Sequence, residues 1–256
     1  MKLAIIGFGI VGKNMHKIFP EAIIVDVAGN YPRRLEEYVD VAFVCVPTPP
    51  GKNGECDTSI VETAIKENRA DVFCVKSTVP PGTIDSLKIM TGGTRIVFSP
   101  EYWGETVDAN CQDYPFVILG GERSACNVVA EAYKRKYPGR FRIKYTDDKT
   151  ACLCKYMENC FLAAKVTFCQ EFYRIASASG VDYDELRELF ITDPRVNPSH
   201  TVVFRDQTYW ESKCLDKDIP ALVQYAQSVG AGALLMNFVD ELNRIHKEKS
   251  DVLQRR

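Results

Sequence analysis

The stretch that decides the fold is KLAIIGFGIVG, residues 2–12. A short apolar run leads into Gly7, Phe8, Gly9, Ile10, Val11 and Gly12, which match the pattern G-x-G-x-x-G. In this pattern the first glycine allows a tight turn, the second lets the backbone approach a pyrophosphate, and the third lets a helix pack closely on a strand. The N-terminus of the following helix offers free N–H groups to phosphates. The stretch therefore predicts a dinucleotide site.

Asp26 stands at the end of the next apolar run, 19 residues after Gly7. A carboxylate at this place binds the hydroxyl groups of the adenosine ribose, and its charge repels a 2′-phosphate. The sequence therefore favours NAD over NADP. Arg33 and Arg34 follow closely and leave NADP open.

Apolar runs and helical stretches alternate over the first half of the chain. We expect strands at residues 2–7, 22–27, 40–46, 71–77, 94–99 and 115–119, and helices at 10–19, 58–68 and 81–90. Short apolar strands separated by helices are typical of a parallel sheet covered on both faces. From residue 147 we expect helices at 147–179 and 183–190, an irregular stretch at 193–213, and then a return to helix. The predicted fold is α/β, with a Rossmann-like, doubly wound sheet in residues 1–146 and an all-helical domain in 147–256.

Composition excludes several classes of function. A formal charge of -2 gives no electrostatic reason to expect nucleic acid or an anionic membrane as a partner, and no apolar run reaches transmembrane length. We therefore expect a cytoplasmic protein. The ten cysteines form no CxxC pair and the three histidines do not cluster with them, so no metal site is predicted. Cys45 and Cys74 lie in apolar runs, where a thiol behaves as a small apolar group.

Further motifs follow the predicted strands. VCVPTPPG (44–51), KSTVPPGT (76–83) and SPEYWGE (99–105) each come after a strand, at the edge of the sheet where ligands bind. KYMEN (155–159) places Lys155 and Asn159 one turn apart on a helix. YWESKCLDKD (209–218) surrounds Cys214 with charged residues at the start of a helix, which favours the reactive thiolate.

Taken together and in this order, the six motifs resemble those of the UDP-glucose/GDP-mannose 6-dehydrogenase (nucleotide-sugar dehydrogenase) family, over nearly the whole chain. The family's versions are G-x-G-x-x-G, a PTP strand end, STVPxGT, SPEFxxE, KxxxN and GGxCxPKD. The resemblance implies NAD-dependent oxidation of the primary alcohol of a nucleotide sugar, such as C6 of UDP-glucose, to a carboxylate. Two hydrides would be removed, with Cys214 carrying a thiohemiacetal and then a thioester. A homodimer built on the helix at 147–179 is also implied.

The resemblance also implies roles for single residues. Lys155 and Asn159 would stabilise the oxyanion, Asp218 would help to take the alcohol proton through water, Glu101 would serve thioester hydrolysis and Thr78 would position water. Arg195 would reach the substrate of the partner subunit. The implied NAD contacts are Gly7, Phe8, Gly9, Ile10, Val11, Gly12, Asp26, Val46, Pro47, Thr48, Thr78 and Glu105, and the implied substrate contacts are Glu101, Tyr102, Trp103, Lys155, Asn159 and Arg195. Plainer readings stay open, because acids favour helix starts and Lys155 with Asn159 could form a solvated helix face.

The sequence also departs from the family pattern. Glu211 and Ser212 stand in place of the paired glycines, so their side chains are expected to occupy space close to the sugar, and Asp216 replaces the proline. The resemblance ends in the helix after Cys214, so we expect a short form without the C-terminal nucleotide-binding domain. Two alternatives therefore stay open: a catalytically impaired, NAD-binding dimer, and a one-step dehydrogenase of the β-hydroxyacid type acting on a smaller substrate.

Overall fold

The computed structural model describes residues 1–52, 54–102 and 115–254. The chain divides into two compact units, Met1–Lys155 and Tyr156–Arg256. Helix α5 (Asp148–Ala178) begins in the first unit and continues into the second. The division between the units therefore lies inside this helix, later than the boundary predicted after residue 146.

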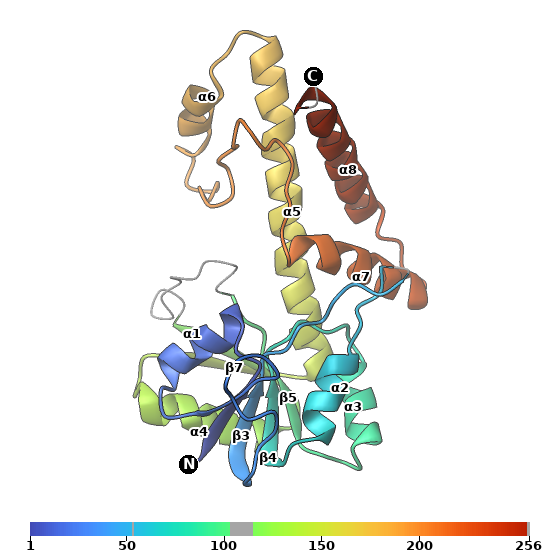
Figure 1. The fold of residues 1–256 in the computed structure, drawn as a ribbon. Coiled ribbons are helices and arrows are strands. Elements are labelled where there is room, and N and C mark those ends of the chain that lie inside the picture. Colours follow the sequence, from blue (N-terminus) through green and yellow to red (C-terminus); the bar gives the residue numbers. More distant parts are fainter. Residues whose placement is uncertain (53, 103–114, 255–256) are drawn as a thin grey trace. The chain divides into compact units, whose positions relative to one another are not determined.

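The first unit is a seven-stranded sheet with helices on both faces (Figure 1). Its strands are β1 (Leu3–Ile6), β2 (Ile23–Val25), β3 (Val39–Val44), β4 (Ala70–Val75), β5 (Ile96–Phe98), β6 (Phe116–Gly120) and β7 (Arg142–Thr146). Its helices are α1 (Ile10–Ile18), α2 (Ser59–Lys66), α3 (Thr83–Met90) and α4 (Arg123–Lys136). The strand order is β2-β1-β3-β4-β5-β6-β7, and every pair is parallel except β5 with β6. This arrangement confirms the predicted Rossmann-like fold.

The two layers of helices follow from the alternation of side chains along each strand. Ile5 and Phe43 point to one face and pack in a cluster with residues of α1 and α4. Ala4 and Ala42, one position earlier, point to the other face and pack with residues of α2 and α3. Both faces are buried in this way, which is why the strands read as almost continuous apolar runs.

The buried cysteines behave as the sequence predicts. Cys74 lies within β4 with no exposed surface, and Cys45 follows β3 and is also buried. Burial raises the pKa of the Cys74 thiol to about 12, so this thiol stays protonated near neutral pH. All of the cysteines that the structure describes are free thiols.

The second unit is helical. After α5 it contains α6 (Tyr183–Phe190), α7 (Leu215–Ser228) and α8 (Leu234–Gln254). Gly180 adopts a left-handed φ of 70° just beyond α5, and the side chain of Asp182 accepts hydrogen bonds from two backbone N–H groups at the start of α6. The return to helix after residue 213 is interrupted near Gly230, which also has a positive φ. None of the helices within the described ranges is both long enough and apolar enough to cross a bilayer.

The irregular stretch between α6 and α7 is fastened to the helices around it. The carbonyl oxygen of Thr201 accepts a hydrogen bond from Tyr183 at 2.9 Å. Trp210 donates its indole N–H to Thr167 at 3.0 Å and exchanges two backbone hydrogen bonds with the amide of Asn243 on α8, at 2.8 and 2.9 Å. The segment just before Cys214 is therefore held between α5 and α8.

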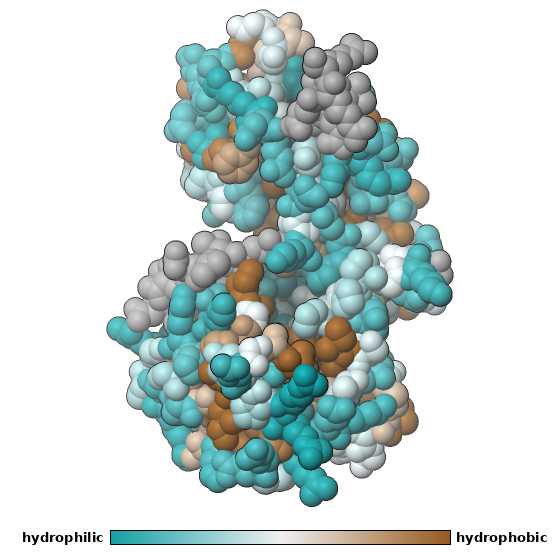
Figure 2. All heavy atoms as spheres, in the orientation of Figure 1, coloured by the Kyte–Doolittle hydropathy of each residue, from teal (hydrophilic) through white to brown (hydrophobic). Residues whose placement is uncertain are grey.

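Hydrophilic side chains cover most of the face of the molecule seen in Figure 2.

His246 on α8 has an environment that opposes its protonation. Its Nδ1 atom is buried and has no hydrogen-bond partner among the described residues. Burial, followed by the positive charges of Arg174 and Lys249, lowers the pKa of His246 to about 4. The folded protein therefore keeps this imidazole neutral.

This environment predicts a loss of stability in weak acid. In the unfolded chain the pKa of a histidine is about 6.5, so below that pH the unfolded state binds a proton that the folded state does not. We expect the free energy of unfolding to fall as the pH decreases from about 6.5 towards about 4, and His246→Gln to flatten this dependence. Urea unfolding of both proteins across this range measures the effect. Parallel curves for wild type and variant would contradict the assignment.

Candidate active site

The glycine turn between β1 and α1 has two glycines that the fold requires and one that it does not. Gly7 has a φ of 93°, and a Cβ atom on it would lie 2.6 Å from the carbonyl oxygen of Cys45. A Cβ on Gly12 would lie 2.0 Å from the carbonyl oxygen of Gly7. A Cβ on Gly9 would meet nothing within 4 Å. Gly9 therefore borders open space, as expected of the position that a pyrophosphate approaches.

Helix α1 begins directly after this turn. Its first turn contains no acidic side chain, and its N-cap residue Gly9 has no side chain to cap it. The backbone N–H groups at Ile10 and Val11 therefore belong to an uncapped helix N-terminus, which suits a phosphate. The ring of Phe8 packs edge-on against Tyr31, with 5.2 Å between ring centroids.

Asp26, the predicted ribose contact, lies beside the glycine turn. One oxygen of its carboxylate accepts a hydrogen bond from the N–H of Phe8 at 2.5 Å, and the other accepts one from Ala28 at 2.7 Å. The backbone of the glycine turn therefore fixes the carboxylate beside the turn itself. Each oxygen keeps a further lone pair that can accept a ribose hydroxyl. The turn and Asp26 together fit NAD.

The loops after β3 and β4 are bonded to each other at the carboxyl edge of the sheet. The buried hydroxyl of Thr48 donates to the carbonyl oxygen of Thr78 at 3.0 Å, and Ser77 donates to the carbonyl oxygen of Val46 at 2.6 Å. Val46 and Thr78 are half-buried, whereas Pro47 is exposed. Because β1 pairs with β3, these loops adjoin the glycine turn. All of these residues lie where a ligand of a doubly wound sheet binds.

Lys76 at the end of β4 is a site residue that our sequence analysis missed. Only 3% of it is exposed, and its ammonium group donates to the hydroxyl of Ser99 at 3.2 Å and to the carbonyl oxygen of Pro100 at 3.3 Å. Burial lowers the pKa of Lys76, while the charge of Glu101 raises it. Glu101 is also buried and follows Ser99 and Pro100 directly in the chain. Its charge therefore acts on the ammonium group of Lys76, which is bonded to those two residues.

Lys155, the last residue of the first unit, lies near Tyr102 and Lys76. It is 4% exposed, and its Nζ atom lies 4.9 Å from the centroid of the Tyr102 ring, within range for a cation–π interaction. Its charge also lowers the pKa of Lys76. The structure thus places Tyr102, which is half-buried, beside the buried Lys155, and the charges of Lys155 and buried Glu101 both act on Lys76. Trp103 and Glu105 lie outside the described residues.

In the second unit the candidate residues gather around Asp218. This carboxylate is 1% exposed, and its two oxygens accept hydrogen bonds from Asn159 on α5 at 2.6 Å and from Lys217 at 2.5 Å. The N–H of Asp218 donates to the carbonyl oxygen of Cys214 at 3.0 Å, so Cys214 lies one helical turn before it. Asn159, Asp218 and Cys214 are therefore brought together by the packing of α7 on α5.

The side chains of the two residues that stand in place of the family's glycines have hydrogen-bond partners in the second unit. Glu211 turns to α8, where its carboxylate accepts a hydrogen bond from Lys247 at 2.6 Å. The hydroxyl of Ser212 accepts hydrogen bonds from the backbone N–H groups of Cys214 and Leu215.

Arg195 is exposed and is paired with Asp193. Its guanidinium group donates to both carboxylate oxygens, at 2.5 to 3.0 Å. This pairing raises the pKa of Arg195 and lowers that of Asp193. Among the described residues of its own unit, the hydrogen bonds of the Arg195 side chain go to Asp193 and to no other predicted site residue.

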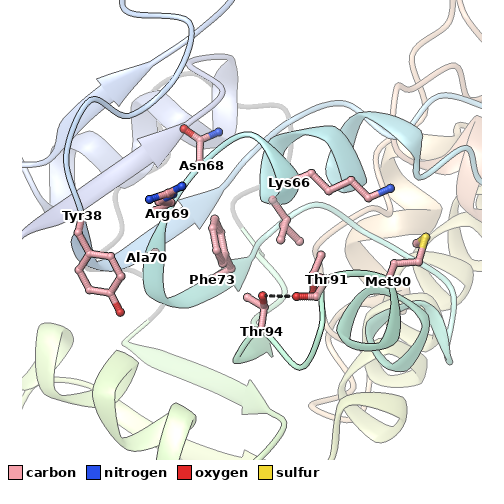
Figure 3. Close-up of a pocket in the computed structure, with 10 residues that line it drawn as sticks. Tyr38, Lys66, Asn68, Arg69, Ala70, Phe73, Met90, Thr91 and Thr94 are labelled. Atoms are coloured by element: carbon pink, nitrogen blue, oxygen red, sulfur yellow. Dashed lines mark hydrogen bonds between the residues drawn. The ribbon is translucent and has the colours of Figure 1, made fainter.

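A hollow of about 420 Å³ lies at the other edge of the sheet (Figure 3). Tyr38, Lys66, Arg69, Thr91 and Thr94 are among its lining residues. These residues lie just before the starts of β3, β4 and β5 or at the ends of α2 and α3. The glycine turn and Thr78 instead come after the ends of strands. In parallel strands these positions belong to opposite edges. The hollow is therefore separate from the candidate dinucleotide site.

Comparison with known proteins agrees with this geometry. Residues 25–137 match the model of the NAD binding domain of the UDP-glucose/GDP-mannose dehydrogenase family, and residues 149–245 match the model of its central domain. The chain belongs to the UDP-glucose/GDP-mannose dehydrogenase family. The match confirms NAD as the predicted cofactor.

Individual relatives and a solved structure of the same family resemble this chain in sequence and fold. GDP-mannose 6-dehydrogenase of Pseudomonas aeruginosa is 30% identical over 210 residues, covering 74% of this chain and 47% of the relative, and UDP-glucose 6-dehydrogenase of the same organism is 26% identical over 226 residues, covering 82% and 49%. A UDP-glucose dehydrogenase from Pyrobaculum islandicum, 23% identical, has the same fold with a TM-score of 0.77 over 95% of this chain and 68% of its own. The chain thus spans about half the length of the curated relatives it matches.

The three glycines predict a pair of variants with opposite effects. Gly9→Val adds a side chain that faces open space, so we expect unchanged stability and an NAD affinity at least about tenfold weaker, because the pyrophosphate loses its approach. Gly12→Ala places a methyl group against a backbone oxygen, so we expect it to destabilise the fold by about 1–3 kcal/mol. Calorimetric titration with NAD and urea unfolding measure the two quantities. Normal NAD affinity in Gly9→Val would show that the pyrophosphate does not lie at this turn.

Proposed function

We propose that this protein is an NAD-dependent dehydrogenase that oxidises the primary alcohol of a nucleotide sugar to a carboxylate through Cys214. The observation that supports this most directly is the arrangement of Cys214, Asp218 and Asn159 in a family member whose first unit fits NAD. A nucleophile needs a nearby group that handles protons and a donor for the developing charge. In the second unit Asp218 lies one helical turn after Cys214, and Asn159 of α5 donates a hydrogen bond to it.

The first step removes a hydride from the alcohol carbon. When bound, NAD accepts this hydride. We assign the hydroxyl proton to water bonded to Asp218, whose buried carboxylate is kept in place by Asn159 and Lys217. The product of this step is an aldehyde.

The second step uses the thiol. The thiol of Cys214 gives its proton to water as its sulfur bonds to the aldehyde carbon, and we assign stabilisation of the resulting oxyanion to Lys155 and Asn159. A second NAD, when bound, would accept the hydride that leaves this carbon, and a thioester would remain. Water then breaks the carbon–sulfur bond, which releases the carboxylate and restores the thiol; Glu101 is our candidate for the base and Thr78 for the hydroxyl that positions this water.

The relatives narrow the substrate class. Those with 30% and 26% identity are named for GDP-mannose and UDP-glucose, which both carry a primary alcohol at C6. We therefore propose a nucleoside-diphosphate hexose as the substrate. The bonded positions of Glu211 and Ser212 favour an active enzyme over an impaired homologue, since neither side chain is left as an unpaired obstruction.

The stoichiometry of NAD reduction tests the proposal. With the correct member of a panel of nucleotide sugars, wild type should form two NADH for each substrate consumed. Cys214→Ser should form at most one, because the thioester cannot form, and its overall rate should fall by about a thousandfold or more. NADH absorbance and mass spectrometry of the sugar measure both quantities.

A matched control removes a thiol that has no proposed role. Cys126 is buried in α4, against the sheet, so Cys126→Ala should keep two NADH per substrate. One NADH per substrate in wild type that survives Cys214→Ser would instead support a one-step dehydrogenase. NAD binding without turnover of any panel member would support the impaired homologue.

We also propose that two copies associate through α5. Apolar side chains spaced three, four or seven residues apart on this helix are exposed: Met157 (76%), Phe161 (62%), Phe168 (47%), Phe172 (41%) and Ile175 (52%). Phe168, Phe172 and Phe190 also line an apolar hollow of about 120 Å³. An exposed apolar stripe of this kind is typical of an interface, and a second copy would present the same stripe.

A charge placed in this stripe tests the dimer. We expect wild type to sediment as a dimer and Phe161→Glu to sediment as a monomer, because a desolvated carboxylate at the interface has no partner. Ile89→Glu is the control, since Ile89 is 82% exposed on α3 in the other unit and should leave the dimer intact. Sedimentation velocity over a range of concentrations measures this. A wild type that is monomeric throughout, or a Phe161→Glu dimer, would contradict the proposal.

A further inference from the structure

The start of α7 is closed by a reciprocal set of hydrogen bonds around Cys214. The hydroxyl of Ser212 accepts from the N–H groups of Cys214 and Leu215, both at 3.1 Å. In return, the carboxylate of Asp216 accepts from the N–H of Ser212 at 3.3 Å. The N–H of Asp216 donates to the carbonyl oxygen of Ser212 at 3.2 Å. Each of the two side chains thus satisfies backbone groups beside the other.

This arrangement works as a helix cap that lies two residues before the nucleophile. The first N–H groups of a helix have no partner within it, and a serine hydroxyl that accepts from them, with an acid that reaches back to the serine N–H, is a known way to satisfy them. Here one of the groups so satisfied belongs to Cys214 itself. The cap therefore acts on the backbone of the residue that carries the thiol.

Both backbone polar groups of Cys214 are held. Its N–H donates to Ser212, and its carbonyl oxygen accepts from the N–H of Asp218 at 3.0 Å. Asp218 is in turn fixed by Asn159 and Lys217. These two backbone hydrogen bonds therefore fix the position of the backbone that carries the thiol.

We propose that Ser212 and Asp216 are positioning residues that hold Cys214 at the height on α7 from which its sulfur reaches the aldehyde carbon. This inference rests on the proposed role of Cys214 as the nucleophile. Neither Ser212 nor Asp216 needs to touch the substrate for this role. Their contribution is to keep the first turn of α7 formed while the thiol changes between free and bonded states.

The surroundings of Asp216 fit a role as a hydrogen-bond acceptor for the Ser212 N–H rather than as a general base. Asp216 is an exposed residue, and partial desolvation of its carboxyl group raises its pKa, whereas the Ser212 N–H and the charge of Lys247 lower it. Glu211 and Asp240 act in the same direction as burial. An uncharged amide could accept the same hydrogen bond from Ser212. The Asp216→Asn variant should therefore keep the cap, and Asp216→Ala should lose it.

Two readouts on the full-length protein test the positioning role. Ser212→Ala and Asp216→Ala should each lower kcat about fivefold or more with KM for NAD unchanged, the factor that loss of a helix cap supplies. They should also lower the rate at which iodoacetamide alkylates Cys214, followed by peptide mass spectrometry. Exposed Cys154 in the same samples is the internal standard. Asp216→Asn and Ser212→Thr should restore both quantities.

The control and the alkylation readout separate this inference from the proposed function. Ser228→Ala removes an exposed hydroxyl at the far end of α7, which donates to the carbonyl oxygen of Tyr225, and should leave both readouts as in wild type. If the alanine variants at 212 and 216 only lower the melting temperature and keep the wild-type kcat and alkylation rate, the two residues are structural and the inference is overturned. If wild type turns over no substrate, the proposed function fails, and the alkylation rates alone decide the positioning role.

Discussion

The second unit depends on one buried charge. A carboxylate with 1% of its surface exposed has lost its water and has to be paired, and Asp218 finds a cation in Lys217 and an amide donor in Asn159. Because Asn159 belongs to α5, satisfying this carboxylate also fixes how α7 packs on α5. Cys214, one turn earlier on α7, is placed as a consequence. Burial of the acid and placement of Cys214 are thus a single constraint.

Most of the fold could be predicted from the sequence because its signals are local. Apolar runs, glycine turns and capping residues such as Gly180 act within a few residues, and six strands and six helical segments were expected from them. Strand β7 was missed, since RIKYT at the edge of the sheet is only partly buried and is not an apolar run like the strands inside the sheet. Helix α4 was also missed. The break between α7 and α8 depends on the positive φ of Gly230, whereas a glycine alone does not end a helix.

Some residues of the candidate site could be predicted from local sequence, and others could not because long-range packing places them. The glycine turn and Asp26 were predictable because the spacing between them reflects one strand, one helix and the next strand. Lys76 was not, since a lysine after an apolar run reads as the point where the chain meets solvent, and only the packing of β4 against β5 buries it. The direction of Glu211 depends on Lys247, which lies 36 residues away on α8. No pattern within the motif around Cys214 contains that information.

The departures around Cys214 are better understood as a replacement than as a loss. A glycine at 212 could not accept from the N–H of Cys214, and a proline at 216 could neither accept from Ser212 nor donate to it. The Ser212 hydroxyl makes two of these four hydrogen bonds, the Asp216 carboxylate makes one, and the fourth joins the backbones of the two residues. Substitutions that accumulate after a site has lost its function have no reason to complement each other in this way. The pairing therefore indicates that this chain still requires an ordered backbone at Cys214, reached by side-chain hydrogen bonds.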